Sequence, residues 1–330
     1  MAESKLYFPP TTGQWETVKP SSIGIDQAKL KKALAYAGNN QSSGVLILYR
    51  GKILAEQYWN EKGVKSERLK RLSIGRDKAG RAIEDAASVQ KSVAAALVCI
   101  VQQKDLLKIE DRVDKYLGKG WSKASPQQES AITIRHLITM TSGLSDRGVF
   151  DVPAGSKWRY NTGMYAKTMA VLEKASGMDR HELTRKWLTD PLGMADSKWV
   201  KRGFAAASTN GYGFATTARD LARFGLMMQA KGKWREKAVL SDHKFLKDAT
   251  TSSQKQNPYY GYLWWLNKST FSPNRLRVAD APKDMFSANG ALNRRCFVVP
   301  SKQLVITRLG ISRAMASGLI ANFGSCLPMQ

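Results

Sequence analysis

The sequence predicts an α+β fold: an antiparallel sheet flanked by terminal helices, with an inserted all-helical domain. Short β-rich runs occur at residues 43–59 and again between residues 259 and 310, whereas the pattern from about 86 to 245 is helical. A sheet that draws its strands from both ends of the chain, with helices segregated from it, defines this class. At 330 residues the chain can also bury a sizeable core.

The predicted organisation has three parts. Residues 1–22 form a Pro-containing N-terminal lead, residues 23–85 and 246–330 together form the sheet domain, and residues 86–245 form the inserted helical domain. A functional site is expected between the two lobes, because clefts of this kind are where ligand sites usually lie.

The N-terminal part contains two predicted elements. The stretch "SSIGIDQAKLKKALAYAG" (21–38) predicts an amphipathic helix that ends at a glycine. The stretch "SGVLILYRGKILAEQYW" (43–59) predicts a β-hairpin with its turn at Arg50 and Gly51.

The rest of the chain is predicted as a helical block followed by strands. Helices are expected at 86–103, 133–143, 165–177, 181–193 and 216–232. Strands are expected within "YYGYLWWLN" (259–267), "MFSANGA" (285–291), "RRCFVVP" (294–300) and "QLVITRLG" (303–310), and a closing helix within "RAMASGLIANFG" (313–324).

The chain is strongly basic. Lys plus Arg number 52 against 27 for Asp plus Glu, which gives a formal net charge of +25. Such a charge can attract an anionic polymer, yet the basic residues are spread along the sequence and no nucleic-acid-binding motif accompanies them. We therefore favour a solvated basic surface over specific nucleic-acid binding, and contact with anionic polymers stays open.

The sequence does not decide the cellular compartment. No stretch approaches the roughly 18–20 apolar residues of a membrane span, and the start "MAESKLYFPP" lacks the apolar core of a signal peptide. We expect a soluble protein without a membrane span. A secreted or periplasmic location, with any signal peptide absent from this chain, is favoured over a cytoplasmic one.

Neither the cysteines nor the histidines form a metal-binding pattern. Cys99, Cys296 and Cys326 show no CxxC spacing, and the three histidines form no HExxH motif. No metal and no cofactor is expected. Cys99 lies in an apolar run and is expected in the core, whereas a bridge between Cys296 and Cys326 is an open alternative to free thiols.

One stretch combines a hydroxyl and an amine in an apolar setting. In "AASVQKSVAAALVCI" (86–100), Ser88 and Lys91 lie three residues apart, so a helix places their side chains together on one face. Burial disfavours the charged form of Lys91, so its neutral amine can accept the proton of Ser88. The N–H groups at the helix N-terminus can face a developing oxyanion.

The bare pattern Ser-x-x-Lys is weak, because Ser241 with Lys244 and Ser252 with Lys255 also match it. Those matches lie in polar segments, and only Ser88 opens an apolar helix. The alternative is a capping serine followed by a lysine whose amine reaches solvent.

The stretch "ASVQKS" resembles the nucleophile motif of the serine β-lactamase and penicillin-binding protein superfamily. The resemblance is to its class C-like branch, with the family VIII carboxylesterases and the 6-aminohexanoate-oligomer hydrolases, and extends from about residue 43 to 310. Further blocks resemble the family in the family's order: "ITIRHLITMTSGL", "PAGSKWRYNTGMYAKTMAVLEKASG", "GFATTARDLARFG" and "GYLWWLN".

The resemblance implies a third catalytic side chain. The family's Tyr-x-Asn motif corresponds to "RYNT", which supplies Tyr160 to share proton transfer with Ser88 and Lys91. The third motif position carries Thr162 where asparagine is usual. The resemblance assigns Thr162 to substrate binding, although a threonine has no amide with which to orient an acyl group.

The family's Lys-Thr-Gly or His-x-Gly strand motif corresponds to "SANGA" here, so Ala288 stands where the family has a cation. The resemblance implies that Asn289 and Gly290 line the substrate site and that the Ala291 N–H joins the Ser88 N–H as an oxyanion donor. Arg294, in place of a glutamine common in esterase relatives, either restores positive charge near the cleft or points to solvent.

Four aromatic residues could form an acyl pocket: Trp158, Tyr165, Trp264 and Trp265. Only Trp158 and Tyr165, beside the tyrosine motif, are assigned to substrate binding, since such residues usually belong to the core.

The function predicted is a metal-free serine hydrolase that forms an acyl-enzyme, with small-molecule esters favoured as substrates. The alternatives are amide or β-lactam hydrolysis, or a non-catalytic binder of a cell-wall fragment or polyanion. Ala288 and Thr162 favour the binder, while the joint presence of Ser88, Lys91 and Tyr160 favours the enzyme.

Overall fold

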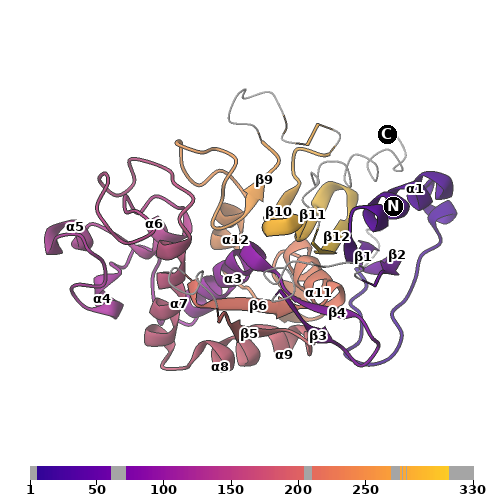
Figure 1. The fold of residues 1–330 in the computed structure, drawn as a ribbon, viewed down its shortest axis with the longest axis horizontal. Coiled ribbons are helices and arrows are strands. Elements are labelled where there is room, and N and C mark those ends of the chain that lie inside the picture. The colour runs from indigo at the N-terminus through magenta and orange to yellow at the C-terminus, as the bar shows by residue number, and fades with distance from the viewer. Residues whose placement is uncertain are drawn as a thin grey trace.

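The chain folds around a six-stranded sheet and a buried helix, as shown by a computed structural model (Figure 1). The structure describes residues 6–60, 72–203, 210–268, 276, 278–279 and 281–311. The expected C-terminal helix at 313–324 and Cys326 lie outside the described residues.

The six-stranded sheet is antiparallel and joins the two ends of the chain, as the sequence predicted. The pairing of Ile47 with Ile306 illustrates how the N-terminal and C-terminal strands meet at its centre. In spatial order the strands are β2 (Lys52–Tyr58), β1 (Ser42–Tyr49), β12 (Leu304–Gly310), β11 (Arg295–Val299), β10 (Phe286–Asn289) and β9 (Trp265–Leu266).

The predicted hairpin turn is confirmed. Arg50 and Gly51 join β1 to β2 with φ values of +51° and +82°, the pair of positive angles that a tight hairpin turn requires. Gly51 has a second reason to be glycine, because a Cβ there would lie 1.8 Å from the carbonyl oxygen of Tyr7.

A second sheet, of four strands, lies below the six-stranded sheet in Figure 1 and was not predicted. Two of its strands come from the segment expected to be all helical, so the insert is not purely helical. These strands are only four or five residues long, which hides their alternation in the sequence. The order is β3 (Ser73–Arg76), β4 (Ala82–Asp85), β6 (Tyr212–Thr216) and β5 (Lys198–Lys201).

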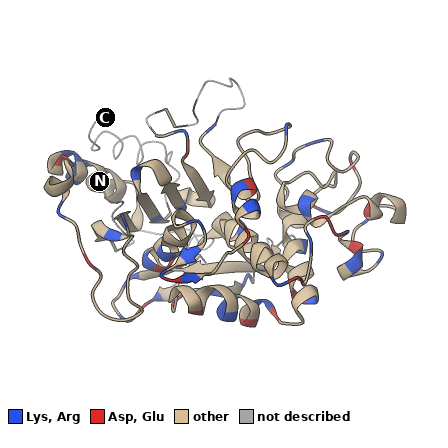
Figure 2. Cartoon of the chain, turned by 180° about the vertical axis from the view of Figure 1, so that it is seen from behind, with Lys and Arg blue, Asp and Glu red and all other residues tan. Residues whose placement is uncertain are grey.

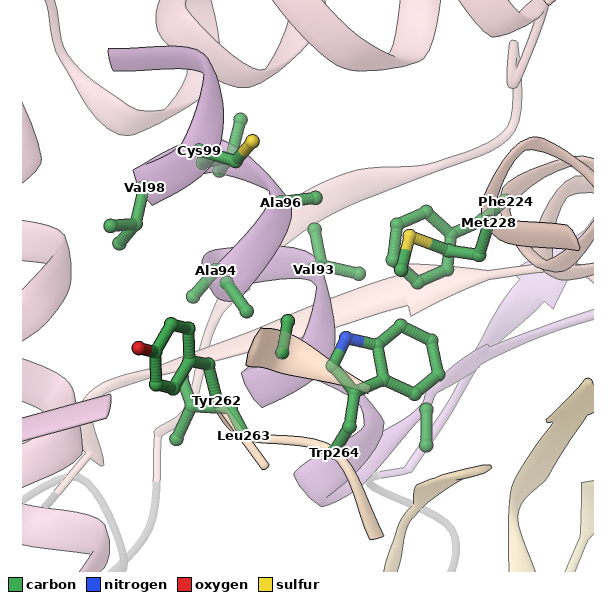
Figure 3. Close-up of a cluster of buried hydrophobic side chains, with 14 of the residues drawn as sticks. Val93, Ala94, Ala96, Val98, Cys99, Phe224, Met228, Tyr262, Leu263 and Trp264 are labelled. Atoms are coloured by element: carbon green, nitrogen blue, oxygen red, sulfur yellow. The ribbon is translucent and has the colours of Figure 1, made fainter. Parts of the chain in front are cut away.

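Helix α3 (Gln90–Gln103) forms the centre of the core. It follows the short 3-10 turn η2 (Ala87–Val89), and every residue from Gln90 to Val101 is buried. Figure 3 shows Val93 and Ala96 on the side of α3 that faces Phe224 and Trp264, whose rings stack 5.7 Å apart. Each buried valine, leucine or isoleucine stabilises the fold by about 1.5–3 kcal/mol, so this helix is fixed firmly in place.

The predicted helices are present with shifted ends. The first begins at Gln27, after its capping Asp26, and runs past Gly38 to Asn39. The helix expected at 133–143 ends at Ile138, since Met140 adopts φ +62°. The remaining helices are α1 (Gln27–Asn39), α4 (Asp114–Leu117), α5 (Pro126–Ser130), α6 (Ile134–Ile138), α7 (Thr162–Ser176), α8 (Arg180–Thr184), α9 (Asp190–Leu192), α11 (Ala218–Gln229) and α12 (His243–Ala249).

Helix α11 lies against strands β11 and β12, although it belongs to the segment predicted as the helical insert. Its Gly225 faces the sheet so closely that a Cβ would lie 2.6 Å from Val305 Cγ1 and 2.7 Å from Cys296 Sγ. The helical insert and the sheet therefore share one packed interface, and the proposed domain boundaries remain a prediction.

The basic charge is distributed over the molecule. Figure 2 shows Lys and Arg on many elements rather than gathered on one of them. Among the described residues, no helix is long and apolar enough to cross a membrane.

The two described cysteines are free and buried. Cys99 lies on α3 in the core, as expected. Cys296 lies on β11 with its Sγ 3.7 Å from the carbonyl oxygen of Leu221, and burial raises the pKa of both thiols.

We expect the substitution Gly225→Ala to lower the free energy of unfolding by about 1–2 kcal/mol, because overpacking against the sheet outweighs the gain in helix propensity. Chemical denaturation measures the change. Gly75→Ala is the control, since an added Cβ there meets no atom within 4 Å. A Gly225→Ala variant as stable as the parent chain would contradict this packing.

Candidate active site

Ser88 lies at the entrance to the buried helix. Strand β4 ends at Asp85, and Ala87 then adopts φ +53°, a left-handed conformation that turns the chain into η2 and α3. The Ala87 N–H donates to Asp85 Oδ1 at 2.9 Å, which supports this conformation. Ser88 is half-buried, so its hydroxyl can be reached at the positive end of the helix.

Lys91 is buried beside Ser88, with only 2% of its surface exposed. Its Nζ donates to Ser88 Oγ at 3.1 Å and to Thr162 Oγ1 at 3.3 Å. The rings of Tyr160 and Tyr165 also contact the amine, with centroids 4.8 and 4.7 Å from Nζ. The structure thus brings together the hydroxyl, the amine and the phenol that the sequence singled out.

The environment lowers the pKa of Lys91 to about 7. Burial is the main cause, because it disfavours the charged ammonium, and the nearby positive charge of Arg202 acts in the same direction. The carboxylate of Asp146 opposes both effects. A large fraction of the amine is therefore neutral near pH 7.

Tyr160 lies beside the same hydroxyl, with which its phenol forms a hydrogen bond. Burial raises the pKa of its phenol above the usual value of 10, and a hydrogen bond with Ser88 and the charge of Arg295 act against this rise. The neighbouring Asn161 fixes the backbone, because its Nδ2 donates to the Leu144 carbonyl at 2.6 Å and its Oδ1 caps α7. Tyr160 is protonated near pH 7.

Two residues assigned to substrate binding contact the lysine instead. Thr162 accepts from Lys91 Nζ, so its hydroxyl orients the amine. Tyr165 is 1% exposed, and its hydroxyl donates to the Gln90 carbonyl at 3.3 Å. A side chain buried to this extent offers no surface to a substrate, so the assignment of Tyr165 to an acyl pocket is corrected.

The turn after β10 approaches Ser88 closely. A Cβ at Gly290 would lie 2.3 Å from the carbonyl oxygen of Ala86, which explains why this position requires glycine. Within the described part of the chain, no backbone hydrogen bond is found for the N–H of Ser88 or of Ala291. These two N–H groups, on segments that approach each other closely, are candidate donors to an oxyanion.

Strand β10 presents no cation. Ala288 is fully buried, so a cationic group is missing at this position of the strand. Asn289 is half-buried, and its Oδ1 has no hydrogen-bond partner among the described residues. Asn289 is thus the polar side chain that this strand can offer to a ligand.

Both expectations for Arg294 are wrong. Its side chain neither lines the site nor points to solvent: it is fully buried and pairs with Glu84, with Nε 2.8 Å from Oε2. The sequence separation of 210 residues left no local signal for this pair.

An aromatic cluster adjoins Tyr160. Trp158 and Trp265 are half-buried, with ring centroids 6.1 Å apart, and Trp265 stacks on Tyr160 at 5.7 Å. Tyr259, which sequence reasoning missed, stacks on Trp265 at 5.7 Å. Trp264 is 1% exposed and belongs to the core, so strand alternation at 264–265 could have separated the two tryptophans.

The described residues contain no group of three His, Cys, Asp or Glu side chains placed to hold a metal ion.

The chain belongs to the β-lactamase family, whose model matches residues 32–310. A curated relative is Penicillin-binding protein 4* of Bacillus subtilis (strain 168), 26% identical over a region covering 39% of this chain and 33% of that protein. The matched region thus spans about a third of the relative's length. The predicted membership of the β-lactamase and penicillin-binding protein superfamily is confirmed.

Solved structures show the same fold at low identity. A candidate 6-aminohexanoate-dimer hydrolase from Bacillus anthracis is 14% identical, with a TM-score of 0.68 over 98% of this chain and 88% of that chain. EstCE1, a hydrolase with promiscuous acyltransferase activity, is 14% identical, with a TM-score of 0.67 over 93% and 99%. A class C β-lactamase mutant is 17% identical, with a TM-score of 0.64 over 90% and 96%. The predicted β-lactamase-like α+β fold is confirmed.

We expect Lys91→Met to stabilise the protein at pH 7 by roughly 2–4 kcal/mol, because the buried amine is lost. Between about pH 7 and pH 10 the unfolded chain keeps a proton on Lys91 that the folded chain has lost, so the unfolding free energy of the parent rises with pH. Below pH 7 both states are protonated and the full burial cost applies.

Chemical denaturation of both proteins at pH 7 and pH 9.5 measures this difference, which should shrink at the higher pH. Lys31→Met on the exposed face of α1 is the control and should show no such pH dependence. Equal differences at both pH values for Lys91→Met would show that the amine is charged in the folded protein.

Proposed function

We propose that this chain is a serine hydrolase that works through an acyl-enzyme, with Ser88 as the nucleophile. The observation that carries the proposal is the 3.1 Å contact between Ser88 Oγ and a buried Lys91 amine whose pKa is about 7. A neutral amine at this distance can accept the hydroxyl proton as the oxygen attacks a carbonyl carbon.

The two proton-transfer groups differ in charge state, which supports different roles. Near pH 7 much of Lys91 is a free amine, whereas Tyr160 holds its proton because its pKa is raised. We assign Lys91 as general base and Tyr160 as the acid that protonates the leaving group. Water then attacks the acyl group on Ser88, and the same groups return the proton to Ser88.

The tetrahedral intermediate requires stabilisation of one negative oxygen. The unpaired N–H groups of Ser88 and Ala291 are the proposed donors, and the N-terminus of α3 adds its positive end. The tight approach of Gly290 to Ala86 supports this assignment, because it holds the two segments side by side.

An uncharged ester is the substrate class that the surroundings favour. Strand β10 offers the buried Ala288 where a substrate carboxylate would need a cation, and Arg294 is turned into the core. The half-exposed rings of Trp158 and Trp265 beside Tyr160 suit an apolar acyl or alcohol group. Trp158 and Asn289 thus remain proposed substrate contacts.

Amide and β-lactam hydrolysis remain the alternative reactions for the same residues. A non-catalytic binder is the third alternative, and Ala288 with Thr162 at the third position of the tyrosine motif favours it. A binder, however, gives no reason for burying an amine between Ser88 and Tyr160 at the cost of stability.

We expect the protein to hydrolyse p-nitrophenyl butyrate and to turn over the β-lactam nitrocefin at least about 10²-fold less efficiently in kcat/KM. Ser88→Ala should lower ester turnover by about 10³-fold or more, because the nucleophile is removed. Ser241→Ala, from an exposed Ser-x-x-Lys match, is the control and should keep full activity.

Covalent labelling by a fluorophosphonate, followed by mapping of the modified peptide, tests the acyl-enzyme directly. The label should appear on Ser88 and be absent from Ser88→Ala. Full turnover in Ser88→Ala would refute the assignment of Ser88 as the nucleophile. Nitrocefin turnover above ester turnover would show that β-lactams, and not esters, are the preferred substrate class.

We further expect kcat/KM for a neutral ester to fall as the pH drops through about 7, because protonation of Lys91 removes the base. Activity should stay on a plateau from pH 8 to 9, because Tyr160, with its raised pKa, keeps its proton there. Initial rates between pH 5 and 9, corrected for spontaneous hydrolysis, give the profile. An activity that is flat from pH 5 to 8 would exclude Lys91 as the base.

A further inference from the structure

Two consecutive buried acids end the strand that leads to Ser88. Glu84 and Asp85 lie at the end of β4, and their side chains are 0% and 2% exposed. Because side chains alternate along a strand, the two carboxylates point to opposite faces of β4. Buried ion pairs seldom add stability over an apolar core, so two of them directly before Ser88 suggest a role in the site.

The carboxylate of Asp85 accepts a hydrogen bond from the backbone segment that leads to Ser88. Its two oxygens accept from Arg202 Nε at 2.8 Å and Nη2 at 2.9 Å, and Oδ1 also accepts from the Ala87 N–H at 2.9 Å. The left-handed conformation of Ala87 costs roughly 1–2 kcal/mol in a residue with a Cβ, and this hydrogen bond offsets part of that cost. Asp85 thereby sets the direction of the Ser88 N–H.

Space for this carboxylate is built into the neighbouring strand. A Cβ at Gly213 on β6 would lie 2.1 Å from Asp85 Oδ2, so the glycine makes room for the ion pair.

The partner of Asp85 also acts on the lysine. Burial and then the charge of Arg202 lower the pKa of Lys91, while Asp146 raises it. The other groups that face the amine are uncharged: the rings of Tyr160 and Tyr165 and the hydroxyls of Ser88 and Thr162. Arg295 acts on Tyr160 from the β11 side. The positive charge of Arg202, which is paired with the carboxylate of Asp85, thus contributes to lowering the pKa of Lys91.

The carboxylate of Glu84 binds the segment after β10, through Arg294. Arg294 donates to it through Nε at 2.8 Å, and the N–H of Gly310 donates to it at 3.1 Å. The hydroxyl of Ser43 donates to its second oxygen. Glu84 thus ties the first and last strands of the chain to the turn after β10.

Arg294 closes that turn around Ala291. Its carbonyl oxygen accepts from the Gly290 N–H at 2.8 Å, and its Nη1 lies 3.5 Å from the Ala291 carbonyl. Leu292 and Asn293 follow with φ values of +59° each, so the turn is strained and requires external support. The buried guanidinium of Arg294 supplies that support through its contact with the Ala291 carbonyl.

We propose that Glu84 and Asp85 are positioning residues that set the two oxyanion donors relative to each other: Asp85 with Arg202 orients the Ser88 N–H, and Glu84 with Arg294 orients the Ala291 N–H. This inference rests on the proposed hydrolase function. The donors lie on segments that are far apart in the sequence, and a single strand, β4, braces both of them through adjacent side chains.

The Asp85 arm is tested by the direction of pH shifts. Arg202→Gln removes a positive charge and leaves the carboxylate, so the acid limb of kcat/KM should move up by roughly half a pH unit or more. Asp85→Asn leaves Arg202 unpaired, so the limb should move down. The double variant should return toward the parent, and Arg202→Lys should restore most of the limb.

A purely structural role of the pair does not produce opposite shifts. Glu56→Gln is the matched control, because Glu56 forms a similar two-oxygen pair with Arg219 on the sheet, at 2.7 Å for each contact. It should leave the limb in place. In the folded double variant Asp85→Asn/Arg202→Gln, kcat should also fall about 10-fold, because the Ala87 N–H loses its acceptor and the Ser88 N–H is no longer held in place. An unchanged kcat in this double variant, or limbs that coincide in Arg202→Gln, Asp85→Asn and the parent, would overturn the Asp85 arm.

The Glu84 arm is tested by an oxyanion mimic. In the double variant Glu84→Gln/Arg294→Gln, which leaves neither charge unpaired in the core, kcat should fall about 10–100-fold with KM changed less than threefold. Affinity for butylboronic acid, which forms a tetrahedral anion on the serine, should fall by a similar factor. Unchanged kcat and boronate affinity in the folded double variant would overturn this arm.

Titration with a fluorophosphonate separates the two levels of inference. A parent protein that is neither labelled nor active refutes the proposed hydrolase itself. If the parent is labelled on Ser88, and the variants are also fully labelled and have the kinetics of the parent, only the positioning roles are refuted.

Discussion

The site depends on keeping the amine of Lys91 out of water. Only 2% of this residue is exposed, and two tyrosine rings lie within 5 Å of Nζ, so the ammonium form loses its hydration without gaining a carboxylate in contact. The neighbouring carboxylate of Asp146 reduces the effect without removing it. The folded state tolerates the free-energy cost of this burial because the other buried side chains of α3 are mostly apolar and stabilise the helix. Lys91, on the first turn, is therefore available for catalysis.

A second constraint is the approach of two backbone segments. The chain enters α3 through Ala86 and Ala87, and the proposed oxyanion site requires the turn after β10 to come close enough for the Ala291 N–H to share an oxygen with that of Ser88. Gly290 permits this approach, and the buried partners of Glu84 and Asp85 keep each side in place. Rigid support of this kind matters because donors contribute to catalysis only when they are oriented before charge develops.

Besides Thr162 on α7, two departures from the family pattern lie on β10 and the turn after it. Lysine, serine and tyrosine are retained, whereas the cationic position of β10 is the buried Ala288 and the glutamine position is Arg294, turned inward. We propose that substrate recognition shifts from charge toward the aromatic cluster of Trp158, Trp265 and Tyr259. The proposed preference for uncharged esters follows from this shift, while the same core of three groups supports acyl transfer in general.

The sequence alone determined what depends on short range: the contact of Ser88 with Lys91 from a three-residue helical spacing, the hairpin at Arg50 and Gly51, and the strands that close the sheet. Family motifs added Tyr160, which spacing could not supply. Tertiary structure decided the rest, because the pairs of Arg202 with Asp85 and of Arg294 with Glu84 span 117 and 210 residues. It also buried Tyr165 and formed a second sheet from strands too short to show a period. Such contacts depend on which faces pack together, and no local pattern encodes that choice.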